Sequence, residues 1–302
     1  MQEILDLVII GAGPAGMTAA IYASRTWMKF KIIEKLSPGG QMIKTDEIDN
    51  YPGFSNISGV DLTLKLVEHL KSLNVDIDYE EATRINKMED ELFEINLKSG
   101  KKLLTKKIIV ATGVNPRRLG LEGEEKFEGK GISYCATCDG FFYKDKIVAV
   151  VGKGESAMTS AIYLSKLAKK VYIINKDGEF KGKSKLIEAI KTKENIEIKY
   201  FSNITKLIGD QKIEKIIVEG EEKEEIKIDG IFVLIGNIPN SKLSENNFDI
   251  CRKKEIIVNG KFETSASNIY AIGDVVTKST RQILTAMSDA VIAVEEIEKS
   301  LI

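Results

Sequence analysis

Short apolar runs that end at glycine-rich turns divide the start of the chain into a strand, a turn, a helix and a second strand. The run Asp6–Ile10 is typical of a strand buried on both faces, and the glycine-rich stretch 11–16 follows it at once. A helix is predicted next, with Pro14 in its first turn, where proline is favoured. A second strand is predicted at Phe30–Ile33 and is followed by Glu34. This order is typical of a nucleotide-binding unit.

The same pattern returns in the middle of the chain. Lys146–Val151 predicts a strand, a glycine-rich turn follows at 152–157, and Val171–Ile174 predicts the next strand. The predicted helices of the two units align without a gap, as MTAAIYAS at 17–24 and MTSAIYLS at 158–165. We therefore interpret the chain as carrying a duplicated nucleotide-binding unit.

Each position of the first glycine motif has a physical interpretation. Gly11 is expected to make the tight turn, Gly13 to let the backbone approach a pyrophosphate, and Gly16 to allow close packing of helix on strand. Glu34 stands where a carboxylate accepts from a ribose hydroxyl and repels a 2′-phosphate, which suits FAD or NAD better than NADP. The late Asp274 can reach a ribityl chain or pyrophosphate, which favours FAD in the first unit. The alternatives are a glycine turn that serves packing alone and an acid that flanks a helix.

A strand and a helix are left over after the second unit, and they determine the predicted domain plan. Residues 268–274 predict a strand that ends in a Gly-Asp pair, and a helix is predicted from about Arg281 to Lys299. These elements most economically complete the first unit. We therefore predict an α/β fold of two Rossmann-like FAD/NAD(P)-binding domains, each of three layers (ββα), with the second inserted into the first. The predicted domains are residues 1–114 with 244–302 and residues 115–243, and the predicted crossings are Val114–Pro116 and 240–247.

Composition and charge restrict the class of protein. Hydrophobic residues make up 43% and charged residues 29% of the chain, which is ordinary for a soluble globular protein. The 44 basic and 45 acidic residues nearly cancel, which does not favour a nucleic-acid or anionic-lipid partner. The start of the chain lacks a basic region and no apolar run reaches spanning length, so we expect neither a signal peptide nor a membrane helix. A chain with three cysteines and no secretory signal is expected in the cytoplasm, where a disulfide is usually catalytic or sensing.

Two cysteines, Cys135 and Cys138, bracket two small residues in the stretch SYCATCDGFFY at 133–143. They could form a redox couple, half of a zinc site, or two packed thiols. A two-residue spacer lets the thiols close a small disulfide ring, and a position at the start of a helix lowers a thiol pKa and makes it a nucleophile. Zinc is disfavoured because a structural site needs four ligands, and only Cys251 and His69 remain, far from the pair in sequence.

Eight short motifs are spread along nearly the whole chain: Gly11-x-Gly-x-x-Gly16, Gly39-Gly-Gln41, Asn50-Tyr-Pro-Gly53, Ala111-Thr-Gly113, Cys135-Ala-Thr-Cys138-Asp139, Gly152-x-Gly-x-x-Ala157, Gly273-Asp-Val275 and Arg281-Gln282. They stand in the order and spacing of the low-molecular-weight thioredoxin reductases of bacteria, and the chain resembles this family. The dithiol in the second nucleotide domain is specific to the group, and related flavoproteins that reduce ferredoxin lack it.

The resemblance implies a homodimer that holds FAD, reduces the disulfide of thioredoxin with electrons from NADPH, and alternates between two domain arrangements. It also implies that Cys138 faces the flavin, that Cys135 attacks the thioredoxin disulfide, and that Asp139 carries a proton. The implied FAD-site residues are Gly11, Gly13, Pro14, Ala15, Gly16, Glu34, Lys35, Gly39, Gly40, Gln41, Met42, Thr45, Asn50, Ala111, Thr112, Gly113, Gly273, Asp274, Arg281, Gln282 and Ile283. The implied pyridine-nucleotide residues are Gly152, Gly154, Glu155, Ser156, Ala157, Lys176 and Lys181.

The second nucleotide site departs from the family pattern where a 2′-phosphate would bind. Asn175 aligns with Glu34, so the acid that repels this phosphate is replaced. The family usually carries arginines in this stretch, but this chain has Lys176, Asp177 and Lys181. Lysine pairs with phosphate only as a point charge, and Asp177 has the wrong sign. The donor is therefore left open between NADPH, NADH with Asn175 or Asp177 on its 2′-hydroxyl, and reduced ferredoxin or another donor. A non-enzymatic flavin and dithiol sensor is the alternative of a different class.

Overall fold

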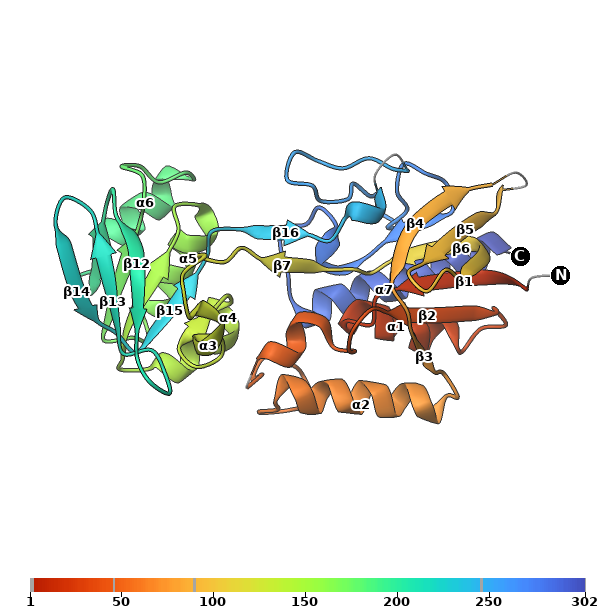
Figure 1. Cartoon of the computed structure of the whole chain (residues 1–302), viewed down its shortest axis with the longest axis horizontal. Coiled ribbons are helices and arrows are strands. Elements are labelled where there is room, and N and C mark those ends of the chain that lie inside the picture. The colour runs from red at the N-terminus through yellow and green to blue at the C-terminus, as the bar shows by residue number, and fades with distance from the viewer. Residues whose placement is uncertain (1–2, 46, 89–90, 245–246, 302) are drawn as a thin grey trace. The chain divides into compact units, whose positions relative to one another are not determined.

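The computed structural model describes residues 3–45, 47–88, 91–244 and 247–301, and the chain divides into two compact units (Figure 1). The first unit comprises the chain up to Ile43, Tyr51–Asn115 and the chain from Ile238 onward. The second comprises Lys44–Asn50 and Pro116–Asn237. The domain boundaries expected from the sequence stay a prediction, and residues 245 and 246 of the expected crossing at 240–247 lie outside the described residues.

The first unit is built on a twisted sheet of order β3-β2-β1-β6-β5-β4, with β17 paired to β6. Strands β1, β2, β3, β6 and β17 run parallel, while β4 and β5 continue the sheet in antiparallel pairing. Strands β5 and β6 form a hairpin around Gly100. The strands are β1 (Ile4–Ile10), β2 (Phe30–Glu34), β3 (Ile77–Tyr79), β4 (Ala82–Lys87), β5 (Phe93–Leu97), β6 (Lys102–Val110) and β17 (Ile269–Ala271).

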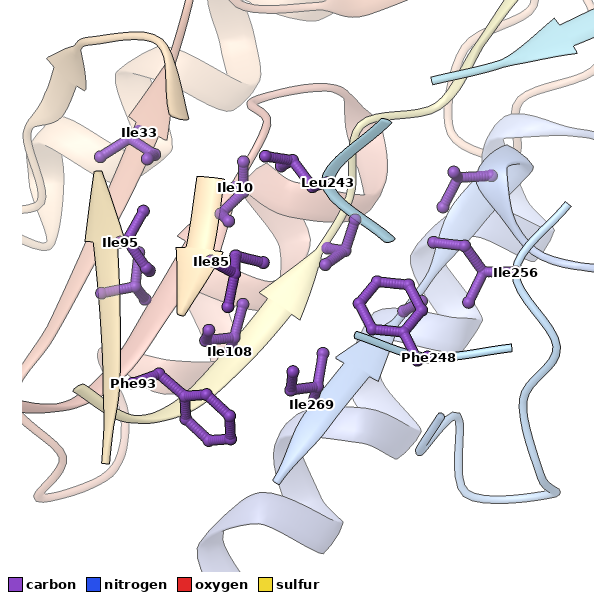
Figure 2. Packing of buried hydrophobic residues seen from close by; sticks show 14 of the residues in the cluster. Ile10, Ile33, Ile85, Phe93, Ile95, Ile108, Leu243, Phe248, Ile256 and Ile269 are labelled. Atoms are coloured by element: carbon purple, nitrogen blue, oxygen red, sulfur yellow. The ribbon is translucent and has the colours of Figure 1, made fainter. Parts of the chain in front are cut away.

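Hydrophobic side chains from distant parts of the sequence pack together in one buried cluster of this unit. Figure 2 shows Ile10, Ile33 and Ile108 from the parallel strands together with Phe93 from β5 and Phe248 from the late segment of the chain. Burying each such side chain contributes roughly 1.5–3 kcal/mol. Helices α1 (Pro14–Ala23), α2 (Gly59–Ser72) and α7 (Ile283–Leu301) complete the unit, and α7 packs against α1. The late strand and helix therefore belong to the first unit.

The second unit repeats this plan. A fully parallel sheet has the order β11-β10-β9-β15-β8, and a separate antiparallel sheet has the order β12-β13-β14. The strands are β8 (Ile132–Ser133), β9 (Ile147–Val151), β10 (Lys170–Ile174), β11 (Ile196–Lys199), β12 (Asn203–Ile208), β13 (Lys215–Glu219), β14 (Lys223–Lys227) and β15 (Gly230–Val233). The helices are α3 (Glu124–Phe127), α4 (Ala136–Asp139), α5 (Glu155–Leu164) and α6 (Ser184–Lys191).

Strand β9 shows how the second unit obtains three layers. Successive side chains of a strand point to opposite faces of its sheet. Val148 and Val150 pack with the helices, in the cluster that contains Met158 of α5. Ala149 and Val151 pack on the other face, in the cluster that contains residues of the antiparallel sheet. The predicted fold class, α/β with two Rossmann-like domains of ββα layering, is thereby confirmed, and it explains why β9 is apolar throughout.

The chain crosses between the units on β7 (Val114–Pro116) and β16 (Asn237–Pro239), which pair with each other. Asn240 fixes the end of this ribbon in the first unit. Its side-chain amide donates to the Thr112 carbonyl at 2.9 Å, and its backbone N–H donates to the Gly113 carbonyl at 2.9 Å. The Thr112 hydroxyl donates to the Asn240 carbonyl at 2.7 Å, so both crossing segments are tied to one another. Among the described residues, no helix has both the length and the apolar character needed to cross a membrane.

Candidate functional site

The glycines of the first turn have different roles: two are required by packing within the protein, and one leaves space for a ligand. Gly11 has φ +107°, and a Cβ there would lie 2.5 Å from the Ala111 carbonyl oxygen. A Cβ on Gly16 would lie 1.8 Å from the Gly11 oxygen, so packing alone requires glycine at both positions. A Cβ on Gly13 would meet no atom within 4 Å among the described residues. The turn is therefore open at Gly13, beside the N-terminus of α1, where N–H groups attract phosphate.

Segments that are distant in sequence border this turn. The Gly39 N–H donates to the Ala12 carbonyl at 2.8 Å, and a Cβ built on Gly40 would lie 3.5 Å from the Gly13 Cα. A Cβ built on Gly273 would lie 3.1 Å from the Cβ of Ala15. The structure thus brings together the following predicted site residues, which we call the first cradle: Gly11, Gly13, Pro14, Ala15, Gly16, Gly39, Gly40, Ala111 and Gly273.

Glu34 lies against the first cradle at the end of β2. Its carboxylate accepts hydrogen bonds from the N–H groups of Ala12 at 2.8 Å and Leu36 at 3.0 Å. A recess of about 500 Å³ begins beside it and is lined in part by Lys35, Leu36 and Tyr79. The predicted ribose-binding acid therefore contacts the first cradle, and the recess begins at the residues that follow it in the chain.

Asp274 is the buried acid that follows Gly273. Its Oδ1 atom is buried and has no hydrogen-bond partner among the described residues. Burial raises the pKa of Asp274, while the positive charges of Arg281 and Lys278 act in the opposite direction. A buried polar atom without a partner is unfavourable. A ligand hydroxyl that donates to Oδ1 would remove this penalty, and the ribityl chain of FAD carries such hydroxyls. The acid therefore fits FAD.

Arg281 orders the loop after Asp274. Its guanidinium donates to Glu255 at 2.7 Å and to the carbonyls of Asp274 and Val276, both at 3.4 Å. The next residue, Gln282, donates its backbone N–H to the Thr285 hydroxyl where α7 begins, directly before Ile283. The sequence predicted that Arg281 and Gln282 hold FAD. The structure gives both residues contacts within the protein, and their contact with FAD stays a prediction.

Asp289 of α7 is a buried acid that the sequence reasoning missed. It accepts from the Gly273 N–H at 2.9 Å and from the Lys278 amine at 2.5 Å. It thereby holds the backbone turn that presents Asp274. The only sequence signal is an acid on the apolar face of the last helix, and this face is recognised only once the helix is placed.

The remaining predicted FAD residues lie in two places. The Gln41 side chain donates to Asn115 at 3.2 Å, which links the glycine segment to the crossing strand β7, and Thr112 and Gly113 directly precede this strand. Met42 is buried in the same short 3-10 helix, Gly40–Lys44. Thr45 and Asn50 lie in the segment that groups with the second unit. They are not part of the first cradle, and their contact with FAD stays a prediction.

The second glycine turn resembles the first at its first and middle glycines, but Ala157 stands where the first turn has Gly16. Gly152 has φ +150°, and a Cβ there would lie 2.5 Å from the Leu234 oxygen and 2.9 Å from the Ala157 Cβ. A Cβ on Gly154 would meet no atom within 4 Å among the described residues. Helix α5 begins at Glu155 and continues through Ser156, so its N-terminal N–H groups face the same opening. The second unit therefore offers an opening of the same kind, which we call the second cradle and which is formed by residues 152–157.

The loop after β10 does not expose all the side chains that the sequence suggested. Asn175 is fully buried, and its amide donates to the Glu179 carbonyl at 3.1 Å while its Oδ1 accepts from the Asp177 N–H at 2.9 Å. The suggestion that Asn175 meets a 2′-hydroxyl is therefore wrong, because packing of the loop uses its side chain. Asp177 forms an ion pair with Lys153 of the second glycine turn. Lys176 and Lys181 are exposed.

Cys135 and Cys138 form a disulfide with a Cα–Cα distance of 5.3 Å. Cys135 follows β8 and caps the one-turn helix α4, and the chain continues into a 3-10 helix at Gly140–Tyr143. Both cysteines are partly exposed. No three His, Cys, Asp or Glu side chains gather as metal ligands in the part of the chain that the structure describes. The dithiol therefore lies at the carboxyl end of a parallel strand, the usual place for reactive groups in such sheets.

Ser133 connects the disulfide to Asp139. Its buried hydroxyl donates to Oδ2 of Asp139 at 2.5 Å and accepts from the Cys135 N–H at 3.1 Å. The predicted proton carrier is thus held beside the cysteine pair by a third residue. Sequence reasoning missed Ser133, and the signal was a hydroxyl two residues before the first cysteine.

Comparisons with known proteins give one consistent family. A family model described as pyridine nucleotide-disulphide oxidoreductase matches residues 5–290. A thioredoxin reductase of Ureaplasma parvum serovar 3 is 41% identical over 97% of this chain and 95% of its own length. The crystal structure of thioredoxin reductase from Streptococcus pyogenes MGAS5005 superposes with a TM-score of 0.92 at 34% identity, covering 100% of this chain and 99% of that chain. A ferredoxin-flavin thioredoxin reductase from Clostridium acetobutylicum has a TM-score of 0.55 at 31% identity, covering 100% and 99%.

Proposed function

Because the chain belongs to the pyridine nucleotide-disulphide oxidoreductase family, and within it to the thioredoxin reductases, we propose that it reduces the disulfide of thioredoxin or a similar small protein through Cys135 and Cys138. The observation that carries this proposal is the Cys135–Cys138 disulfide in a unit that also holds a nucleotide cradle. The enzyme is a flavin oxidoreductase, and its family uses FAD and a pyridine nucleotide.

FAD fits the first unit. The pyrophosphate would lie at Gly13 and the N-terminus of α1, Glu34 would accept from the ribose, and the buried Oδ1 of Asp274 would accept from a ribityl hydroxyl. The recess beside Lys35 and Leu36 would take the adenosine end. When bound, FAD takes an electron pair from a reduced donor and passes it to the disulfide.

The reduced cysteine pair would act by thiol–disulfide exchange. The Cys135 thiolate attacks one sulfur of the thioredoxin disulfide, whose S–S bond breaks, and the other thioredoxin sulfur leaves as a thiolate and takes a proton. Cys138, as a thiolate, then attacks Sγ of Cys135 in the mixed disulfide. This step re-forms the Cys135–Cys138 bond and releases the second thioredoxin sulfur. Asp139, oriented by Ser133, would hold and return the proton that the cysteine pair exchanges.

A pyridine nucleotide is the donor that the second cradle supports, because Gly154 leaves the same opening as Gly13. Reduced ferredoxin is the alternative donor. The likeness to a ferredoxin-flavin thioredoxin reductase and the absence of arginines at 175–181 favour it. Flavin absorbance followed anaerobically with NADPH, NADH and reduced ferredoxin in parallel distinguishes these donors. Bleaching by any of them, coupled to turnover, excludes a non-enzymatic sensor.

The test of the dithiol assignment is Cys135→Ser, with Cys251→Ser as the matched control. We expect Cys135→Ser to bind FAD and to lose thioredoxin reduction, because exchange cannot start without its thiolate. Cys251→Ser should keep both properties, since Cys251 lies in the first unit, outside the disulfide. Thioredoxin reduction by Cys135→Ser at the parent rate would contradict the proposal.

The resemblance also suggests a homodimer, the three cysteines without a recognisable secretory signal favour the cytoplasm, and we include both in the proposal. Light scattering on the FAD-loaded protein measures the mass in solution and so tests the dimer. Fractionation of cells that express the chain tests the location.

A further inference from the structure

The loop after β10 is anchored to the second glycine turn. The Lys181 N–H donates to the Lys153 carbonyl at 2.8 Å, and Lys181 pairs with Gly154 in a short parallel bridge. The Lys183 N–H donates to Oε1 of Glu155 at 3.2 Å. These bonds hold the loop beside the opening at Gly154. The backbone that carries the lysines of the loop therefore lies next to any nucleotide that binds at Gly154.

Three lysines and one carboxylate gather at this place. The amine of Lys153 forms an ion pair with Oδ2 of Asp177, and both side chains are only partly exposed, at 29% and 40%. Burial lowers the pKa of Lys153, and the positive charges of Lys181 and Lys176 act in the same direction. Lys176 directly precedes Asp177, and the backbone of Lys181 pairs with Gly154, so both lysines add positive charge around the Lys153–Asp177 ion pair.

Asp177 is held in place by contacts of its own loop. Its N–H donates to the fully buried Asn175 side chain at 2.9 Å, and the adjacent Gly178 packs so close to Phe201 that a Cβ would lie 2.2 Å from the ring. These contacts hold the backbone on both sides of Asp177, whose carboxylate forms the ion pair with Lys153. The carboxylate of Asp177 thereby neutralises the positive charge of Lys153 at the second cradle.

We propose that Asp177 competes with the 2′-phosphate of NADPH for Lys153, and that this ion pair determines the preference of the second site between NADPH and NADH. The proposal rests on a pyridine nucleotide as the donor. A phosphate monoester carries about two negative charges and a carboxylate one, so a 2′-phosphate displaces Asp177 and is held by Lys153, Lys176 and Lys181. A neutral 2′-hydroxyl cannot displace it. Asp177 thus weakens NADPH binding without serving NADH.

Binding of two nucleotide probes to the FAD-loaded full chain tests the competition by calorimetry. The probes are adenosine 2′,5′-bisphosphate and adenosine 5′-monophosphate, which differ only in the 2′-phosphate. We expect Asp177→Asn to bind the bisphosphate about tenfold more tightly and the monophosphate unchanged. Lys153→Met should weaken the bisphosphate more than about tenfold, because Asp177 is then an unpaired anion. Lys185→Met, an exposed lysine on α6, is the matched control and should change neither affinity.

The double variant Lys153→Met/Asp177→Asn separates competition from simple charge. We expect it to recover most of the bisphosphate affinity that Lys153→Met loses, since the unpaired anion is gone. If Asp177→Asn weakens the monophosphate and leaves the bisphosphate unchanged, Asp177 serves a ribose hydroxyl and the proposal is overturned. Failure of the parent protein to bind either probe also overturns it. Neither result bears on the proposed reduction of thioredoxin, which Cys135→Ser tests with any electron donor. Melting curves and the FAD spectrum verify that each variant is folded.

Discussion

Asp274 is the residue whose surroundings most directly require a ligand. The sequence indicated it through a Gly-Asp pair after a buried strand, because this pattern places an acid at the carboxyl edge of a sheet. The sequence could not indicate that Oδ1 would be buried without a partner, because that burial comes from packing between segments distant in the chain. Asn175 failed as a prediction for the same reason. Its alignment with Glu34 is correct, but the loop buries its side chain.

Asp274→Asn is predicted to stabilise the protein without FAD and to weaken FAD binding. Burial raises the pKa of Asp274 above its ordinary value of 3.8, so the charged form is disfavoured in the folded protein. The resulting loss of stability is absent at low pH, develops as pH rises through the range above 3.8, and is complete above the raised pKa. The melting-temperature advantage of Asp274→Asn should therefore be absent at low pH and grow as the pH rises above 3.8.

Two measurements check this prediction. Calorimetric melting of the FAD-free proteins should show the growing advantage, and titration with FAD should show about tenfold weaker binding, because a hydrogen bond to a charged acceptor contributes about 1.5–3 kcal/mol. Asp210→Asn is the control, since that side chain is 93% exposed. A FAD-free Asp274→Asn that melts below the parent at neutral pH would show that the acid is not strained.

At the level of the element, the best-predicted feature is the strand, glycine turn and helix. The turn is predictable because its requirements are local: a positive φ at Gly11 and contact of Gly16 with the Gly11 oxygen. Strands β4 and β12 were missed for physical reasons. Only one side chain of β4, Ile85, is fully buried, and β12 carries an irregularity between Ile204 and Lys206 that breaks the alternation. Periodicity cannot find a strand that has almost no buried face or that shifts register.

Gly13→Ala is predicted to weaken FAD binding without lowering stability, whereas Gly16→Ala is predicted to lower the stability of the protein itself. A methyl group on Gly16 would overlap the Gly11 oxygen, and overpacking of this kind destabilises a protein by typically about 1–3 kcal/mol. A methyl group on Gly13 meets no described atom of the protein, and its φ of −72° suits alanine, so stability without FAD should stay near the parent value. FAD affinity should fall at least about tenfold, because the backbone can no longer approach the pyrophosphate. Urea unfolding of the FAD-free proteins and FAD titration separate the two. Equal destabilisation by both variants would refute this division of roles.

For the whole molecule, the sequence established the duplication because it is visible in aligned residues, and the structure adds that both turns share one steric plan. The sequence did not reveal that Lys44–Asn50 groups with the second unit. That grouping depends on contacts between segments with no shared motif. The donor site shows the same limit of sequence-based prediction. Its charged residues can be identified in the sequence, but the ion pair between Lys153 and Asp177 cannot.

Gly154→Ala is predicted to slow reduction of the flavin by NAD(P)H and to leave the other steps of the reaction unchanged. The methyl group would enter the second cradle, so we expect NAD(P)H to reduce the flavin far more slowly, while FAD binding and the melting temperature stay unchanged. Flavin that is reduced by light under anaerobic conditions should still pass electrons to thioredoxin. Stopped-flow absorbance measures the first step and thioredoxin thiols report the second. Unchanged reduction by NAD(P)H would place the donor elsewhere.

Gly154 is a glycine that the fold itself does not require. Its φ of −91° and ψ of 176° are open to any residue, and the fold gives no steric reason for glycine there, whereas Gly152 is required by its neighbours. In a lineage whose second cradle had stopped meeting a ligand, random substitution would therefore reach position 154 before position 152. The middle glycine of such a turn therefore indicates whether the turn still binds a nucleotide. A relative that keeps Gly152 but has a larger residue at position 154 is a candidate for a changed electron donor.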